Sequence, residues 1–77
     1  MAITVEIRDP KKLTVIDIYL NDDDIKYLIR DLEDLIGRND HFHYMSPDWG
    51  GDELGTNKHG PDALVAHHLC IVRIDDD

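Results

Sequence analysis

The chain has a single cysteine, few aromatic residues and no long apolar run. One cysteine cannot form an internal disulfide, so noncovalent packing has to hold the fold together. Cys70 lies in an apolar segment, which favours a buried structural thiol over a reactive one. The apolar runs are only a few residues long, too short for a membrane span, and no signal-peptide pattern opens the sequence. We therefore expect a cytoplasmic protein.

Basic residues are also scarce. Eight Lys and Arg stand against 17 Asp and Glu, which gives a net charge of −9. This balance disfavours direct binding to nucleic acid or to an anionic membrane, because contacts with phosphate require lysine and arginine. It permits a basic protein as partner, with electrostatic steering that weakens in salt. The alternative is that the acids only keep a small protein in solution.

A length of 77 residues predicts one domain, residues 1–77. Residues 2–8 alternate in polarity as a half-buried strand does, and Asp9-Pro10 predicts a type I turn. Residues 13–20 predict a second strand, antiparallel to the first. The side chains expected to face the core are Ile3, Val5 and Ile7 on the first strand and Ile16, Ile18 and Leu20 on the second.

The helix has the strongest pattern in the chain. Its apolar residues recur at the helical period from Ile25 to Ile36. Asn21 predicts the N-cap, with Asp24 three residues later as its capping-box partner. The acidic run 22–24 then lies where the helix dipole favours negative charge, and Gly37 predicts the C-terminal end.

The second half of the chain predicts two further strands. Residues 41–45 alternate, and a loop follows at 46–62, which holds four of the five glycines and in which residues 52–55 could form one helical turn. Residues 63–74 predict one long last strand, apolar on both faces, before an acidic tail at 75–77.

Together these segments predict an α+β fold with the order β-β-α-β-β. We expect one four-stranded, mainly antiparallel sheet with the helix on one face. The second face is then expected to expose Val15, Tyr19 and part of the last strand. An apolar patch of this kind indicates an interface, either with a second copy in a homodimer or with a different protein.

Histidines suggest a metal site as one hypothesis. His41 and His43 point the same way because strand side chains repeat every two residues, and His68 on a neighbouring strand could be a third ligand. Zinc or another transition metal would fit such a set. No His-Glu-x-x-His or Cys-x-x-Cys motif is present, so hydrogen-bonding histidines in a sheet are favoured and no cofactor is expected.

Catalysis is also disfavoured. A histidine with Glu53 could act as a general acid and base, but the loop offers only Lys58 to stabilise developing negative charge. Trp49 stands before two glycines that can turn the chain sharply. Tryptophan serves as a core anchor or as an interface hot spot, and the core interpretation is slightly favoured.

Three segments carry a family resemblance. They are His41-x-His43-x-Met45, then Trp49-Gly50-Gly51-x-Glu53-Leu54, then His68-Leu69-x-Ile71. The second half of the chain thereby resembles the immunity protein 32 family, whose members are small α+β bacterial proteins inferred to neutralise a toxin of polymorphic toxin systems. One departure is His67, where asparagine is expected.

The resemblance implies a non-enzymatic protein that binds a cognate toxin domain and blocks it. An acidic protein suits a basic toxin, for which a nuclease is the natural guess. Carboxylates of the long loop would then meet cationic groups at the toxin site. The candidate partner-binding residues are Asp48, Trp49, Asp52, Glu53 and Tyr44.

Overall fold

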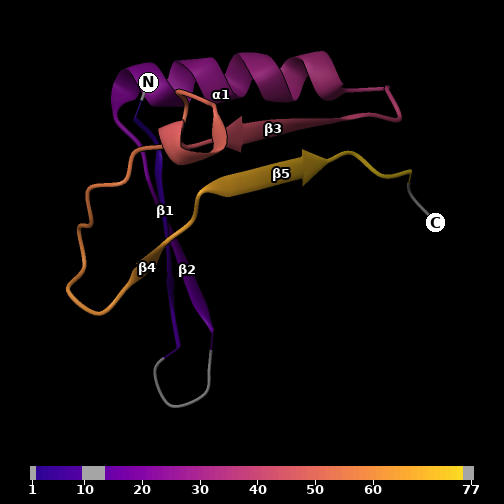
Figure 1. Ribbon diagram of the computed structural model, residues 1–77. Helices are drawn as coiled ribbons and strands as arrows, with labels where there is room; N and C mark the ends of the chain where they lie inside the picture. The colour runs from indigo at the N-terminus through magenta and orange to yellow at the C-terminus, as the bar shows by residue number, and fades with distance from the viewer. Residues whose placement is uncertain (1, 10–13, 76–77) are drawn as a thin grey trace.

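The computed structural model describes residues 2–9 and 14–75 (Figure 1). Its elements in chain order are β1 (Thr4–Arg8), β2 (Val15–Tyr19), α1 (Asp22–Leu35), β3 (His41–Met45), the 3-10 turn η2 (Pro47–Trp49), β4 (Leu64–Val65) and β5 (His68–Val72). The α+β class and the antiparallel pairing are confirmed, but the single four-stranded sheet is wrong. Two small sheets form instead, with the orders β2-β1-β4 and β3-β5. Within the described residues, no helix has the length and apolarity that crossing a bilayer requires.

The first sheet grows from the predicted hairpin. β1 and β2 pair antiparallel with Val5 opposite Ile18 and Ile7 opposite Ile16, so the predicted alternation of faces is confirmed. Arg8 and Asp17 form an ion pair at 2.8 Å on the second face. Of the turn predicted to begin at Asp9-Pro10, only Asp9 belongs to the described part of the chain, because residues 10–13 lie outside it.

The predicted long last strand is divided because its two halves serve different sheets. Leu64 pairs with Ile7 in the first sheet, and the Ala66 N–H still bonds the carbonyl of Val5 at 2.7 Å. One residue later the carbonyl of His67 accepts from Ser46 N–H at 2.9 Å, which begins the pairing with β3. An apolar run on both faces predicts a strand without showing that its neighbours change halfway.

The helix forms as predicted at both ends. The Asn21 side chain accepts from Asp24 N–H at 2.8 Å, and the Asp24 carboxylate accepts from Asn21 N–H at 3.1 Å. That same carboxylate, although buried, also accepts from Ala2 N–H at 3.3 Å, so it ties the helix to the start of the chain. Gly37 has φ +78°, the left-handed conformation that ends a helix.

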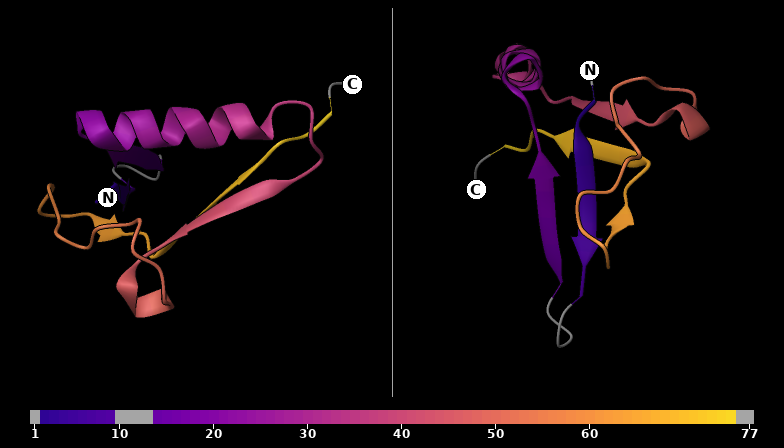
Figure 2. Two further views of the ribbon diagram at one scale, coloured as in Figure 1. Left: turned by 90° about the horizontal axis from the view of Figure 1, so that it is seen from above. Right: turned by 90° about the vertical axis from the view of Figure 1, so that its left-hand side faces the viewer.

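The core lies where the two sheets cross beneath the start of the helix. Ile3, Val5, Tyr44 and Leu54 are each no more than 3% exposed and form one cluster. Figure 2 shows the β1–β2 hairpin crossing β5 and extending away from α1. On the core face, only the half of the hairpin near the helix is therefore covered by other elements.

The uncovered surface lies on the opposite face from the one predicted. Tyr19 stacks on the ring of His59 at 4.2 Å, and the buried Glu6 carboxylate accepts from His59 N–H at 2.6 Å. The long loop thus covers part of the face expected to be open, although Tyr19 itself stays 36% exposed. Ile16 and Ile18, predicted to be in the core, are 62% and 49% exposed because the single helix does not reach them.

Candidate partner-binding site

The loop after β3 is a tightly hydrogen-bonded turn. The carbonyl of Ser46 accepts from the N–H groups of Trp49 and Gly51 at 2.9 and 3.0 Å. Gly50 has φ +87°, and a Cβ on Gly51 would lie 2.5 Å from the carbonyl oxygen of Met45. Both glycines are therefore required by the backbone path. The helical turn of this loop lies at Pro47–Trp49, ahead of the segment in which sequence suggested one.

The end of the loop, residues 53–54, is hydrogen-bonded to Met45 and to Ile3 of the core. Glu53 accepts from Met45 N–H through its carboxylate at 3.0 Å. Buried Leu54 donates to the Met45 carbonyl at 3.2 Å, while Ile3 N–H donates to the carbonyl of Glu53 at 3.0 Å. His67, the departure from the resembled family, contacts the buried Ser46 hydroxyl through Nδ1 at 2.7 Å. We will call residues 46–54 the Trp49 loop.

At the tip of this loop a tryptophan is open to solvent. Trp49 is 59% exposed, so the core interpretation is wrong. The reason is geometric: the 3-10 turn directs the indole outward, and its ring centroid lies 5.7 Å from that of His68. The carboxylate of Asp48 is 74% exposed, and Asp52 is exposed as well. Three of the five candidate partner-binding residues therefore share one accessible surface.

The other two candidates support that surface from within. Tyr44 is 3% exposed and donates its hydroxyl to Asp31 Oδ2 at 2.6 Å, so it is not available for direct contact. Burial, and then the bond to Asp31, raise the pKa of the Tyr44 phenol far above its ordinary value. Glu53 is half-buried, and one oxygen of its carboxylate accepts from the backbone N–H of Met45 at 3.0 Å, so the side chain supports the base of the loop.

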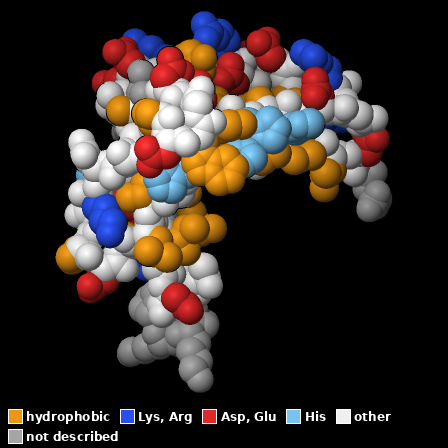
Figure 3. Space-filling model, viewed as in Figure 1, with side chains coloured by type: hydrophobic (Ala, Val, Ile, Leu, Met, Phe, Trp, Pro, Cys, Tyr) orange, Lys and Arg blue, Asp and Glu red, His pale blue; other side chains and the backbone are white. Residues whose placement is uncertain are grey.

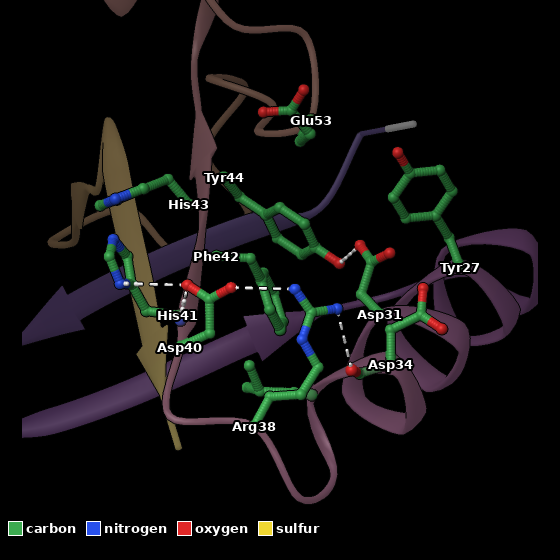
Figure 4. Close-up of a pocket in the computed structure, with 11 residues that line it drawn as sticks. Tyr27, Asp31, Asp34, Arg38, Asp40, His41, Phe42, His43, Tyr44 and Glu53 are labelled. Carbon is green, nitrogen blue, oxygen red and sulfur yellow. Dashed lines mark hydrogen bonds and ion pairs between the residues drawn. The ribbon is translucent and has the colours of Figure 1, made fainter. Parts of the chain in front are cut away.

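An acidic cleft of about 260 Å³ begins beside Glu53 and runs between β3 and α1 (Figure 4). Asp31, Asp34 and Asp40 line it, with Arg38 as its one lining cation. Arg38 bonds Asp40 at 3.1 Å, and the N–H of His41 donates to Asp40 at 2.8 Å. That backbone bond, with the nearby Arg38 charge, holds the pKa of Asp40 below its usual range. Sequence reasoning did not single out these three aspartates, because Asp40 follows the helix and no local pattern shows that it lies beside Asp31 and Asp34.

The three histidines of the metal hypothesis lie together on the outer face of β3 and β5. His43 Nδ1 is 2.6 Å from His68 Nε2, and the ring centroids of His41 and His43 are 4.7 Å apart. A row of histidine side chains is visible on this face in Figure 3. Within residues 2–9 and 14–75, no group of three or more His, Cys, Asp or Glu has a geometry that could hold a metal ion.

Cys70 lies on the same sheet, directly opposite His43, and is exposed. The prediction of a buried thiol is therefore wrong, because an apolar neighbourhood in the sequence does not fix which face of a two-stranded sheet is covered.

Comparison of the chain with protein-family models, with curated proteins and with solved structures gave no match.

Proposed function

We propose that this chain is a non-catalytic bacterial immunity protein that binds a basic toxin domain and occludes its active site. The observation that carries the proposal is the exposed Trp49, held on a fixed turn beside exposed carboxylates. Aromatic side chains with few rotatable bonds are the usual anchors of protein interfaces, and pre-ordering the loop lowers the entropy lost on binding.

The electrostatics of the same region suit a cationic partner. Asp48 and Asp52 flank the tryptophan, and the acidic cleft continues from Glu53 along α1. With a net charge of −9, the whole molecule would attract a basic domain from a distance. Arginine or lysine side chains that bind substrate phosphates in a nuclease toxin would meet carboxylates here, and the body of the protein would block entry to that site.

Inhibition of the toxin domain encoded beside this chain tests the proposal. Stoichiometric amounts of wild type should abolish its activity. Trp49→Ala should weaken the complex by about 2 kcal/mol, or roughly 30-fold in Kd. Tyr19→Ala is the matched control. Tyr19 is also an exposed aromatic residue, but it stacks on His59, which is not part of the Trp49 loop. Full activity of the toxin domain in excess protein would refute the proposal.

The charge component has its own signature. Asp48→Asn with Asp52→Asn should slow association and flatten its dependence on salt, with a smaller effect on dissociation. Asp22→Asn with Asp23→Asn removes the same charge from the first turn of α1, outside the Trp49 loop, and we expect association to change less.

A second candidate function is transition-metal binding, because His43 and His68 lie side by side on the outer face of β3 and β5. Their 2.6 Å contact is a hydrogen bond, so the two rings would have to move apart for both nitrogens to bind one zinc ion, with further ligands from water or a partner. Elemental analysis of protein purified without a histidine tag decides this, and less than about a tenth of an equivalent of metal would exclude it.

A further inference from the structure

The core face of the first sheet continues beyond the core without a cover. On β1 this face carries the buried Val5 and then Ile7, which is 38% exposed. Cross-strand neighbours of these residues are exposed further: Ile18 lies opposite Val5, while Ile16 and Leu64 lie on either side of Ile7. Exposed fractions are 49% for Ile18, 62% for Ile16 and 70% for Leu64. Adjacent apolar side chains on one sheet face normally pack against another layer.

The helix is uncovered along the same border of the core. Its apolar stripe is wide, but only the edge with Leu28 and Leu35 packs inward. At about 100° per residue, the four remaining members occupy the adjoining sector of the helix. They are Ile25, Ile29, Leu32 and Ile36, exposed by 40%, 49%, 41% and 77%. Turning the helix to bury them would withdraw Asp31 from Tyr44, so the roll of the helix is fixed.

An apolar cleft of about 330 Å³ connects the helix to the second sheet. Leu32 and Ile36 line it from α1, and Ile71 lines it from β5. Figures 1 and 3 show the hairpin and the C-terminal arm extending in different directions from the core, with a hollow between them. We call the exposed residues of the hairpin sheet, the helix stripe and this cleft the open apolar face.

The amount of surface agrees with a missing layer. A folded monomer of 8.9 kDa is expected to expose about 4,800 Å², whereas this chain exposes 5781 Å². The excess of about 1,000 Å² is close to the roughly 800 Å² that each partner contributes to a stable interface. The excess is a property of the whole chain, and it is large enough for one such face to be covered by a second copy.

The distribution of charge indicates which molecule covers the open apolar face. The exposed side chains that define the open apolar face are all aliphatic, although the chain carries 17 acids. Asp17 and Arg8 lie on the reverse of the hairpin, and the one charged residue lining the apolar cleft, Arg73, bonds Asn39 and Asp75. A surface that binds a basic partner would be expected to present carboxylates, as we propose for the Trp49 loop. A second copy, itself at −9, can approach only through a surface that lacks them.

We propose that a second copy of this chain covers the open apolar face, so that the protein is a symmetric dimer. The Trp49 loops lie on a different surface of each copy and remain free in this assembly. The inference is independent of the toxin proposal, since it concerns other residues and needs no partner.

Sedimentation velocity of the untagged full chain from about 1 to about 100 µM tests the inference. Wild type should approach twice the monomer mass of 8.9 kDa. Ile16→Glu on the sheet and Ile29→Glu on the helix should each raise the dimer Kd at least about 30-fold. Thr56→Glu adds the same charge to an exposed loop and should leave the Kd unchanged.

A wild-type monomer at every concentration overturns the inference, and so does a dimer whose Kd is unaffected by both isoleucine variants. Amide hydrogen exchange on wild type gives an answer that needs no variant to fold. Protection of β2 and α1 should rise with protein concentration, while the Trp49 loop stays unchanged. Equal protection of β2 and α1 at low and high concentration contradicts the dimer.

Discussion

Glu6 offers the sharpest test of how the long loop is held. Its carboxylate is 0% exposed and accepts from the backbone N–H groups of His59 and Gly60, at 2.6 and 3.0 Å. Each oxygen takes one donor, and more than 50 residues of chain separate Glu6 from these donors. Glu6→Gln replaces one oxygen by an NH₂ group. This removes one hydrogen-bond acceptor and places the new amide N–H group against the backbone N–H of His59 or Gly60.

The expected cost follows from the bonds lost. A hydrogen bond to a charged acceptor contributes about 1.5 to 3 kcal/mol, and a buried donor left without a partner adds to the loss. We expect Glu6→Gln to lower the free energy of unfolding by about 2 to 4 kcal/mol. A chain of this length has about 4 to 12 kcal/mol in total. The melting temperature should therefore fall by about 10 °C or more.

Asp17→Asn is the matched control, since Asp17 lies directly opposite Glu6 on β2 and the same charge is removed. Its ion pair with Arg8 is surface-exposed and should contribute about 1 kcal/mol or less. Urea unfolding followed by circular dichroism, at a concentration low enough to keep the protein monomeric, compares the two variants. If Glu6→Gln costs no more than Asp17→Asn, the loop is not held by this carboxylate.

Three further predictions concern the Trp49 loop and the acidic cleft. Gly51→Ala should cost more than about 2 kcal/mol, because its Cβ meets backbone, whereas Gly37→Ala meets nothing within 4 Å and should cost about 1 kcal/mol. Reversing that order in urea unfolding would contradict the loop geometry. The pKa of Tyr44 is raised in the folded state, so its contribution to the free energy of unfolding should be fully present below pH 10 and should be lost as the pH rises above that value. Tyr44→Phe should remove part of that fall, and an unchanged slope would exclude Tyr44 as its source. Trp49 should fluoresce with a solvent-exposed maximum in the free protein, and a blue-shifted one would place the indole in a core.

Local patterns in the sequence predicted the local structure well. The capping box at Asn21, the end at Gly37 and the alternation along β1 and β3 depend on residues within a few positions of one another. These elements consequently form as predicted.

Residues distant in the sequence decided what could not be predicted. The last strand divides because two residues far apart in the chain bond its successive backbone groups. Val5 accepts from Ala66 N–H, and Ser46 N–H donates to the carbonyl of His67. Which sheet face is covered depends on the bond from His59 to Glu6, for which no local pattern exists. The outward position of Trp49 follows from the 3-10 turn at Pro47–Trp49, where the sequence pattern had suggested a helical turn only at residues 52–55. The sequence placed four of the candidate partner-binding residues in one loop, and their exposure had to come from the structure.

Titration of any basic toxin domain encoded beside this chain, with the proposed immunity protein added in increasing amounts, tests the central proposal most directly. Its activity should fall in proportion to added protein and reach zero near one equivalent. The same titration with Trp49→Ala should need a large excess. Undiminished activity at a tenfold excess of correctly folded wild type would contradict the account.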